Sequence, residues 1–459
     1  MNRENAWTTY EEADIKALEG LCKEYKDFLS NGKTERECVA QSIELAKKAG
    51  YQDLEELIKN QTPLKAGNKV YRTWMEKTIA LFQIGEDAIE DGLNILGAHI
   101  DSPRLDLKQN PLYEDTEMAL LDTHYYGGVK KYQWVTIPLA LHGVVVKKDG
   151  TKIDVVVGEE ETDPVVMVSD LLVHLASEQQ QKKATEVIAG EDLNILVGSM
   201  PLEGEEKEAV KANILKLLKE KYDFEEEDFM SAEIEIVPAG KARDLGLDRS
   251  MVAGYGHDDR ICAYTSLLAL LETESTKKTS VVLLVDKEEV GSIGATGMQS
   301  RFFENAVAEL MDRVGEYSEL KLRRALANSK MLSSDVTAAF DPNYAGAYEK
   351  KNSAFFGKGL AFAKYTGARG KSGCNDANAE FVAWLRNVMD ENDVAYQMAE
   401  LGKVDQGGGG TIAYILAEYG MEVIDCGVAL QNMHAPWEVA SKVDIFETMR
   451  GYKAFLMAE

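Results

Sequence analysis

The stretch Val281–Gly297, VVLLVDKEEVGSIGATG, has the pattern of a buried strand that runs into a polar turn. Its first five residues are apolar and rich in β-branches, which favours a strand of a parallel sheet over a helix. Asp286, Glu288 and Glu289 follow at once, where α/β enzymes place their ligand sites. Adjacent carboxylates beside a dry core repel each other unless a cation or solvent offsets their charge. Taken alone, the stretch is interpreted more simply as a solvated loop after a strand, so the rest of the chain has to decide.

The composition is that of a globular protein with a large negative charge. Its 459 residues are enough for roughly two or three domains, and 45% of them are apolar, so a sizeable core can form. The formal net charge of −27 disfavours binding of nucleic acid or anionic lipid. Five cysteines without a CxxC pair favour a reducing compartment over a disulfide framework. Because there is neither an apolar leader nor a run of about 18 apolar residues, we expect a cytoplasmic protein without a membrane partner.

The segments on either side of this stretch alternate between strand and helix patterns, which is typical of an α/β fold. Residues 93–100, LNILGAHI, form a second mostly apolar run that ends in polar residues. Two capping boxes, Thr9–Glu12 and Thr34–Glu37, predict the starts of two packing helices, and residues 440–456 predict a closing helix. We predict a central mixed, largely parallel sheet flanked by helices, formed by residues 1–105 together with 250–459.

Residues 106–249 have a different, β-rich pattern and are interpreted as an inserted domain. Residues 139–158 predict a hairpin around the turn signal Asp149-Gly150. Residues 207–221 indicate a charged amphipathic helix, and the apolar segment Val165–Leu175 is expected to be helical as well. Exposed apolar strands in such an insert often pair with another subunit, although burial within the same chain is an equal alternative.

Several segments place an acid or a histidine after an apolar strand or at the start of a helix. These residues are His99 with Asp101, Asp258 with Asp259, Glu288 with Glu289, Asp335, and His434. Each one alone has a structural explanation as a core histidine, a helix cap or a loop residue. Together they supply the nitrogen and oxygen ligands, the bridging carboxylate and the separate base that a two-zinc site needs.

The spacing within two of these pairs gives a physical reason for both members. In His99-Ile100-Asp101, the period of two along a strand points both side chains to the same side, so Asp101 can accept the imidazole N–H and fix its tautomer. Glu288 and Glu289 are consecutive, so their side chains diverge. One of them can therefore bind metal while the other reaches a water molecule.

Five sequence blocks also resemble a known family. They are GAHIDSPRLDLK (97–108), GYGHDDR (254–260), DKEEVGSIGATG (286–297), SSDVTAAFDPNY (333–344) and NMHAPWE (432–438). The blocks resemble, in order and over nearly the whole chain, the signatures of the aspartyl aminopeptidase and vacuolar aminopeptidase I family of dinuclear zinc exopeptidases. The resemblance implies a zinc-exopeptidase fold of the α/β class and an enzyme that removes the N-terminal residue from short peptides.

The resemblance also implies a role for each site residue. It implies that Asp258 bridges two divalent ions, that His99 and Asp335 complete one metal site, and that Glu289 and His434 complete the other. In addition, Glu288 would be the general base and Asp101 would orient His99, whereas Asp259 is the less favoured bridge. Zinc is the expected metal, although manganese and cobalt use the same ligands.

Assembly and substrate choice are further expectations from the resemblance. Members of the family form dodecamers through the inserted domain, and His174 matches a histidine that reaches a neighbouring active site; a helix histidine packed in an interface is the alternative. The basic, substrate-facing segment of the aspartyl branch matches residues 367–381 poorly. Arg369 and Lys371 could pair with an acidic P1 side chain or could be solvated, so a neutral or an acidic preference is left open.

Two other functions are compatible with parts of the pattern. A related zinc hydrolase, such as a carboxypeptidase or an N-acyl amino-acid deacylase, would need a cationic pocket for a free carboxylate. A non-catalytic metal-binding assembly protein would have no use for Glu288 as a base. We therefore expect a metallo-aminopeptidase with two divalent ions, peptide substrates and a homo-oligomeric state.

Overall fold

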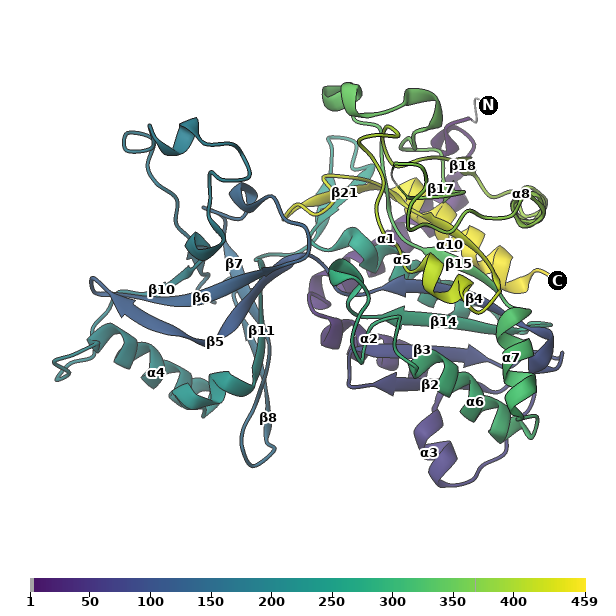
Figure 1. Ribbon diagram of the computed structural model, residues 1–459, viewed down its shortest axis with the longest axis horizontal. Coiled ribbons are helices and arrows are strands. Elements are labelled where there is room, and N and C mark those ends of the chain that lie inside the picture. Colours follow the sequence, from purple (N-terminus) through teal and green to yellow (C-terminus); the bar gives the residue numbers. More distant parts are fainter. Residues whose placement is uncertain (1–3, 368) are drawn as a thin grey trace. The chain divides into compact units, whose positions relative to one another are not determined.

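The computed structural model describes residues 4–367 and 369–459. Within these residues the chain divides into two compact units (Figure 1). Unit 1 consists of the residues up to Asp101, Ala242–Met433 and Glu438–Glu459, and unit 2 consists of Ser102–Lys241 and His434–Trp437. No helix in this part of the chain is both long and apolar enough to cross a lipid bilayer.

The main sheet of unit 1 has nine strands in the described part of the chain, in the order β1-β2-β3-β14-β4-β15-β19-β17-β18. Their bounds are β1 Gln52–Asp53, β2 Lys69–Trp74, β3 Thr78–Gln83, β14 Thr279–Val285, β4 Leu93–His99, β15 Lys330–Ser334, β19 Glu422–Gly427, β17 Leu360–Ala363 and β18 Tyr396–Met398. The four neighbours β14, β4, β15 and β19 are parallel, whereas β3 joins β14 and β17 joins β19 in antiparallel pairs. The predicted mixed, largely parallel sheet is therefore confirmed.

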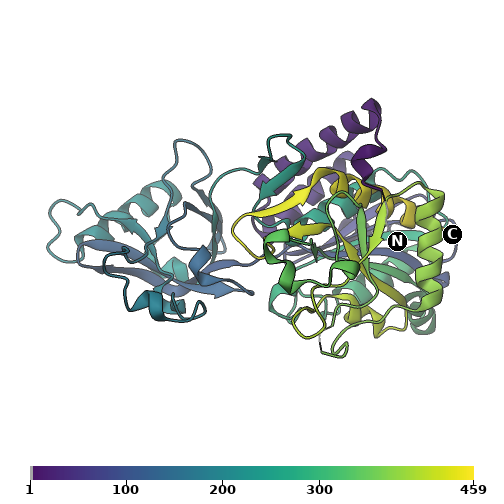
Figure 2. The ribbon, with the colours of Figure 1, turned by 90° about the horizontal axis from the view of Figure 1, so that it is seen from above.

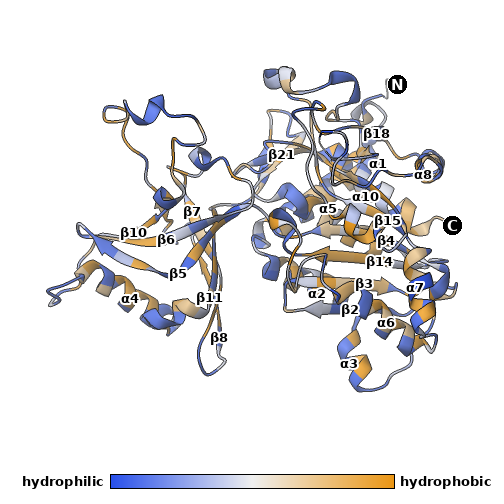
Figure 3. Cartoon of the chain, viewed as in Figure 1, coloured by the Kyte–Doolittle hydropathy of each residue, from blue (hydrophilic) through white to orange (hydrophobic). Residues whose placement is uncertain are grey.

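Helices cover both faces of this sheet because its central strands are apolar on both sides, as the colours of β3 and β14 in Figure 3 show. In β14, Val282 and Leu284 belong to one core cluster, while Val281 and Leu283 belong to the other. The first cluster includes α1 Glu12–Asn31, α2 Glu35–Lys48, α5 His257–Leu271, α8 Ala379–Glu391 and α10 Lys442–Met457. The second includes α3 Leu54–Lys59, α6 Phe302–Val314, α7 Glu319–Ala327 and α9 Ala413–Ala417. Figure 2 shows α1 and α2, in purple, at the periphery of unit 1.

The register of the parallel strands brings their carboxyl ends to one edge of the sheet. Val285 of β14 lies opposite His99 of β4, and Ser333 of β15 lies opposite Gly97. The acidic residues that follow β14, β4 and β15 therefore leave the sheet at the same edge. This is the edge at which α/β folds place their sites.

A smaller sheet of unit 1 contains the strand that leads into α5. Its order among the described residues is β12-β13-β21-β20-β16, with bounds Arg243–Leu245, Met251–Gly254, Glu438–Ser441, Ala429–Gln431 and Thr337–Ala338. β13 ends at Gly254, three residues before α5 begins, and Gly254 lies opposite Glu438 in the antiparallel pair with β21. Glu438 is thereby placed next to the start of α5.

Unit 2 is an antiparallel sheet with one long helix, in agreement with the β-rich pattern of its sequence. The strand order over the described residues is β8-β7-β11-β5-β6-β10-β9. The bounds are β8 Lys152–Val157, β7 Leu139–Val146, β11 Ala232–Pro238, β5 Arg104–Asp115, β6 Met118–Tyr126, β10 Ile195–Gly198 and β9 Met167–Val168, and the helix is α4 Ala209–Tyr222. The predicted hairpin is confirmed as β7 and β8, and the predicted amphipathic helix is confirmed as α4.

Two local predictions are wrong. The segment Val165–Leu175 is not a helix: it contains the short strand β9 and then turns, with Leu172, Val173 and Leu175 exposed. Val168 of β9 is buried, but most of the other apolar residues there are exposed, so their spacing carries no helical information. The capping box of α1 is formed by Glu11 and Asp14 and not by Thr9, whereas the box of Thr34 and Glu37 at the start of α2 is confirmed.

Candidate metal centre

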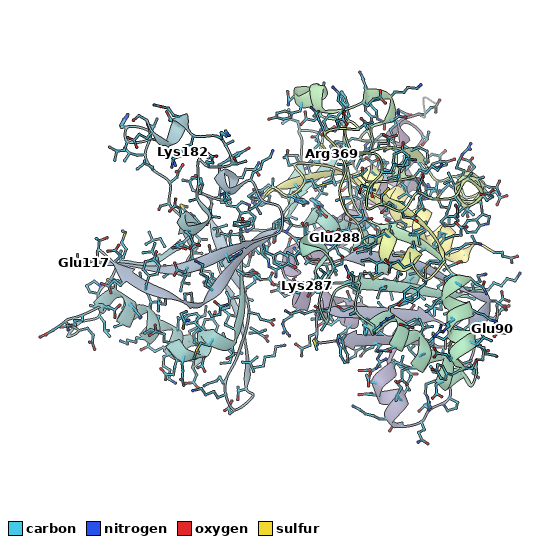
Figure 4. The ribbon with its side chains drawn as sticks, viewed as in Figure 1. Glu90, Glu117, Lys182, Lys287, Glu288 and Arg369 are labelled. Atoms are coloured by element: carbon cyan, nitrogen blue, oxygen red, sulfur yellow. The ribbon has the colours of Figure 1, made fainter. Side chains whose placement is uncertain are left out.

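Four segments of unit 1 bring the predicted histidine and acids together around the His99 ring. His99 ends β4, Asp258 stands in the first turn of α5, Glu288 follows β14 and Asp335 follows β15. The His99 Nε2 atom lies 3.2 Å from Asp258 Oδ1, and it lies 3.8 Å both from Glu288 Oε2 and from Asp335 Oδ1. Figure 4 labels Glu288 at this place on the ribbon. Residues separated by more than 200 positions in the sequence thus share one site.

Both carboxylate oxygens of Asp101 contact residues of this cluster. Oδ1 lies 3.3 Å from His99 Nδ1 and accepts the backbone N–H of Glu288 at 3.1 Å. Oδ2 accepts the backbone N–H of Glu289, also at 3.1 Å. Asp101 is fully buried, so these contacts are shielded from water. His99 Nδ1 also lies 3.0 Å from the backbone carbonyl oxygen of Asp101. Asp101 therefore holds the imidazole with its carbonyl group and its carboxylate, and it holds the turn of the glutamate doublet with the carboxylate.

The two neighbouring aspartates at the start of α5 differ in their surroundings. Asp258 points its carboxylate at His99, whereas Asp259 Oδ2 accepts the backbone N–H of His99 at 3.4 Å. Neither residue has helical backbone angles, so other contacts set their directions. The backbone N–H of Asp258 donates to Glu438 Oε2 at 3.0 Å, and the preceding His257 bonds Tyr25. The Asp258 carboxylate thus faces the cluster, whereas the Asp259 carboxylate bonds the backbone of His99.

The crowded acids shift the ionisation of the histidine and of one another. Burial alone would lower the pKa of His99, but hydrogen bonds to Asp101 and Asp258 raise it well above its ordinary value. Burial, and after it the charge of Asp259, raises the pKa of Asp335 well above the usual range. Burial also raises the pKa of Asp259. The cluster therefore favours added positive charge, and a divalent cation would supply it.

The donor set fits a divalent metal ion. His99 with Asp258 and Asp335 offers ligand atoms that all lie within 4.8 Å of one another, and so does His99 with Glu288 and Glu289. One imidazole nitrogen combined with carboxylate oxygens is a set that zinc, manganese and cobalt accept. The arrangement can therefore hold positive charge close to a glutamate at the edge of a sheet.

The other predicted residues make the following contacts. His434 belongs to unit 2, where its Nδ1 atom lies 2.9 Å from the Gly128 carbonyl oxygen, and its role as a ligand stays a prediction. His174 is exposed in a turn of unit 2, so the interpretation as a helix histidine is wrong. Lys371 bonds Asp376 at 2.8 Å and stacks over Tyr365, whereas Arg369 is exposed.

Glu438 is the residue that sequence reasoning missed. It stands four positions after His434 in the block NMHAPWE, and the sequence alone indicates no role for it. Its carboxylate is buried and bonds Asp258. No local sequence pattern shows that a glutamate is buried. The only indication in the sequence is that Glu438 stands at the start of a short apolar strand.

The parallel sheet with a histidine and acids at its carboxyl edge defines a metal-dependent hydrolase of the zinc exopeptidase type. Comparison with known proteins makes the assignment specific, because the model of the family described as aminopeptidase I zinc metalloprotease (M18) matches residues 28–456. The chain belongs to the M18 family of peptidases. It is accordingly an aminopeptidase, as the sequence analysis predicted.

Relatives match over almost the full chain. The probable M18 family aminopeptidase 1 of Clostridium acetobutylicum is 66% identical over 453 residues, which cover 98% of this chain and 97% of the relative. A crystal structure of an M18 aminopeptidase from Thermotoga maritima has a TM-score of 0.94 at 47% identity, with 99% of each chain covered. The mApe1 dodecamer of S. cerevisiae, 20% identical with a TM-score of 0.77, has the same fold.

Proposed function

We propose that this aminopeptidase hydrolyses the N-terminal peptide bond with two divalent metal ions, most simply zinc, and with Glu288 as the general base. The proposal is carried by one observation: carboxylate oxygens of Asp258, Glu288 and Asp335 all lie within 3.8 Å of His99 Nε2. In this proposal Asp258 would hold both ions, His99 and Asp335 would complete one site, and Glu289 and His434 would complete the other.

The residues of the chain divide the chemistry among them. When bound, the ions would lower the pKa of a water molecule and polarise the scissile carbonyl group. Glu288 would accept the proton of the attacking water and return it to the leaving amine. Asp101 holds the Glu288 backbone, so the base keeps its direction during both proton transfers. Asp101 also faces the imidazole Nδ1, which leaves Nε2 for the metal.

The test separates metal binding from proton transfer. Glu288→Gln keeps the shape of the side chain but cannot accept a proton, so we expect about two bound ions per chain and a loss of kcat of about a thousandfold or more. Asp258→Ala is the matched variant that should lose metal. Metal content is measured by elemental analysis, and turnover is measured with aminoacyl substrates. Normal turnover by Glu288→Gln would rule out the assigned base.

We also propose a preference for a neutral P1 side chain. Lys371, which is one of the two basic candidates for an acidic P1 group, is already paired with Asp376 at 2.8 Å. A panel of leucyl, alanyl, aspartyl and glutamyl substrates, each with a free and with a blocked amino group, tests this proposal. A higher kcat/KM for the acidic substrates would contradict it, and cleavage of the blocked substrates would contradict aminopeptidase specificity.

A homo-oligomer, proposed here to be a dodecamer, is the working form of the enzyme. In unit 2, Leu172, Val173 and Leu175 are 54%, 67% and 64% exposed, which is a large apolar surface for one loop. His174 lies in the same loop, and we place it at the active site of a neighbouring subunit. The distant yeast structure is a dodecamer, which supports this assembly.

Replacement of apolar residues in this loop tests the assembly. Leu172→Ser combined with Val173→Ser should lower the molar mass measured by light scattering, because the contact loses apolar area. Leu320→Ser, an equally exposed residue of unit 1, is the control and should keep the mass of the wild type. An unchanged mass of the double variant would show that this loop makes no essential subunit contact.

The cytoplasm is the proposed location of the enzyme. Its five cysteines are all free, and four of them are buried. Free cysteines persist in a reducing compartment. Fractionation of cells that express the tagged protein would decide this point.

A further inference from the structure

The first turn of α5 carries Asp258 to the metal cluster, yet its own backbone does not follow the helix there. Asp258 has φ −81° and ψ 105°, and Asp259 has φ −118° and ψ 26°. Helical hydrogen bonds therefore cannot fix the direction of the Asp258 carboxylate. Groups from other segments have to hold it, and a carboxylate that bridges two ions tolerates little misplacement.

Three buried contacts hold this turn, one at each of three consecutive residues. Tyr25 of α1 bonds His257 Nδ1 through its hydroxyl group at 2.6 Å. The carboxylate of Asp259 accepts the backbone N–H of His99 at 3.4 Å. Between them, the backbone N–H of Asp258 donates to Glu438 Oε2 at 3.0 Å. Only this last contact acts on the residue that faces the cluster.

Glu438 is placed for this contact by the small sheet. It is the first residue of β21, and it lies opposite Gly254 at the end of β13, so its side chain lies beside the chain that leads into α5. It is 1% exposed, and Asp258 is 3% exposed. A buried backbone N–H costs free energy if it loses its hydrogen-bond acceptor, so the Glu438 oxygen restrains the Asp258 backbone.

We propose that Glu438 is a positioning residue that aims the Asp258 carboxylate at the metal ions through its hydrogen bond to the Asp258 backbone. This inference rests on the proposed function of Asp258 as the bridging ligand. Glu438 itself touches neither the ions nor the substrate in this proposal. Removal of the Glu438 side-chain acceptor should therefore lower the metal affinity. A substitution that keeps this acceptor should change the affinity little.

Two variants of Glu438 separate the acceptor from the charge. Glu438→Ala removes the acceptor, so metal affinity should fall by about ten- to a hundredfold. Glu438→Gln keeps an amide oxygen that can accept the same N–H while the negative charge is lost, so its affinity should stay within about threefold of the wild type. Affinity is measured on the metal-free protein by competition between zinc and a chromogenic chelator.

Glu447 of α10 supplies a matched control. It is also 1% exposed, and its carboxylate accepts a backbone N–H, that of Ala395 at 2.7 Å. It bonds Tyr10 and Arg450 and has no contact with the cluster residues described above. Glu447→Ala should therefore lower the melting temperature while the affinity for zinc stays at the wild-type value. This control distinguishes positioning from a general loss of stability.

The outcomes are distinct. Weak zinc binding by Glu438→Ala together with near-normal binding by Glu438→Gln supports positioning. Equal losses in both variants would show that the charge of Glu438 matters and would overturn the proposal, as would normal binding by Glu438→Ala. If Glu438→Ala does not fold, the glutamine variant alone decides, because a large loss there contradicts positioning. A wild-type protein that binds no zinc would instead refute the proposed metal centre itself.

Discussion

Asp101→Asn is the substitution with the clearest expected consequence at the candidate site. The Asp101 carboxylate accepts two backbone N–H groups, those of Glu288 and Glu289, and it faces His99 Nδ1 at 3.3 Å. Asparagine has the same shape but offers only one acceptor oxygen, because its other terminal group is an N–H donor. At least one of the two glutamate N–H groups therefore loses its partner at a contact that is partly shielded from water.

The size of the effect follows from these contacts. A hydrogen bond to a charged acceptor contributes about 1.5–3 kcal/mol, and a buried donor left without a partner costs a similar amount. If this energy is lost from the metal-bound state, the affinity for zinc falls by about ten- to a hundredfold, because 1.4 kcal/mol corresponds to a factor of ten. We expect a decrease in kcat as well, since the turn that carries Glu288 is no longer held.

The assay compares zinc affinity and turnover of Asp101→Asn with those of Asp444→Asn. Asp444 is a matched control, because it is also buried and accepts two backbone N–H groups, those of Gly357 at 2.8 Å and Gly359 at 2.7 Å. The control should lose stability but keep its zinc affinity and its turnover at saturating zinc. Equal zinc affinity of Asp101→Asn and the wild type would refute the reasoning that this carboxylate organises the site.

Three further predictions concern stability. Burial raises the pKa of Asp425 to about 7. The contribution of this carboxyl group to the unfolding free energy is therefore full below about pH 4 and is lost as the pH rises through 7, by up to about 1.4 kcal/mol per pH unit. Asp425→Asn should lack this decline when denaturant titrations at about pH 5 and about pH 8 are compared. Thr34→Ala removes the acceptor for the Glu37 N–H at 3.2 Å and should lower the unfolding free energy by about 1 kcal/mol, with an unchanged value arguing against the cap. Zinc at a hundred times its dissociation constant should raise the unfolding free energy of the metal-free wild type by about 2.7 kcal/mol but not that of Asp258→Ala, and equal gains would place the zinc elsewhere.

Two central strands of the sheet, β14 and β4, were predictable from sequence because each contains a run of mostly apolar residues. β14 and β4 are buried on both faces, so every residue from Val281 to Val285 had to be apolar, and the polar residues after them marked the carboxyl edge. The convergence of His99 with Glu288 and Asp335 then follows from parallel pairing, whereas Asp258 comes from the first turn of α5. The family followed from the same blocks.

Features that depend on tertiary contacts were not predictable. The segment Val165–Leu175 has the apolar content of a core helix, but it is an exposed loop, and no pattern within the chain separates these cases. The contact of Asp101 with two backbone N–H groups depends on the turn after β14, where Lys287 takes a positive φ of 75°. The assignment of His434–Trp437 to unit 2 likewise depends on packing and has no local signal.

The position of β4 in the middle of the sheet has a consequence for how the chain folds. Both neighbours of β4 come much later in the sequence: Ala98 pairs with Leu284, and Gly97 pairs with Ser333. During synthesis both edges of β4 therefore stay unpaired until roughly two hundred more residues have left the ribosome. Strands with unpaired edges aggregate easily. Early collapse of unit 2, which accounts for most of this interval, would shorten the loop to be closed and lower the entropic cost of pairing β14 with β4.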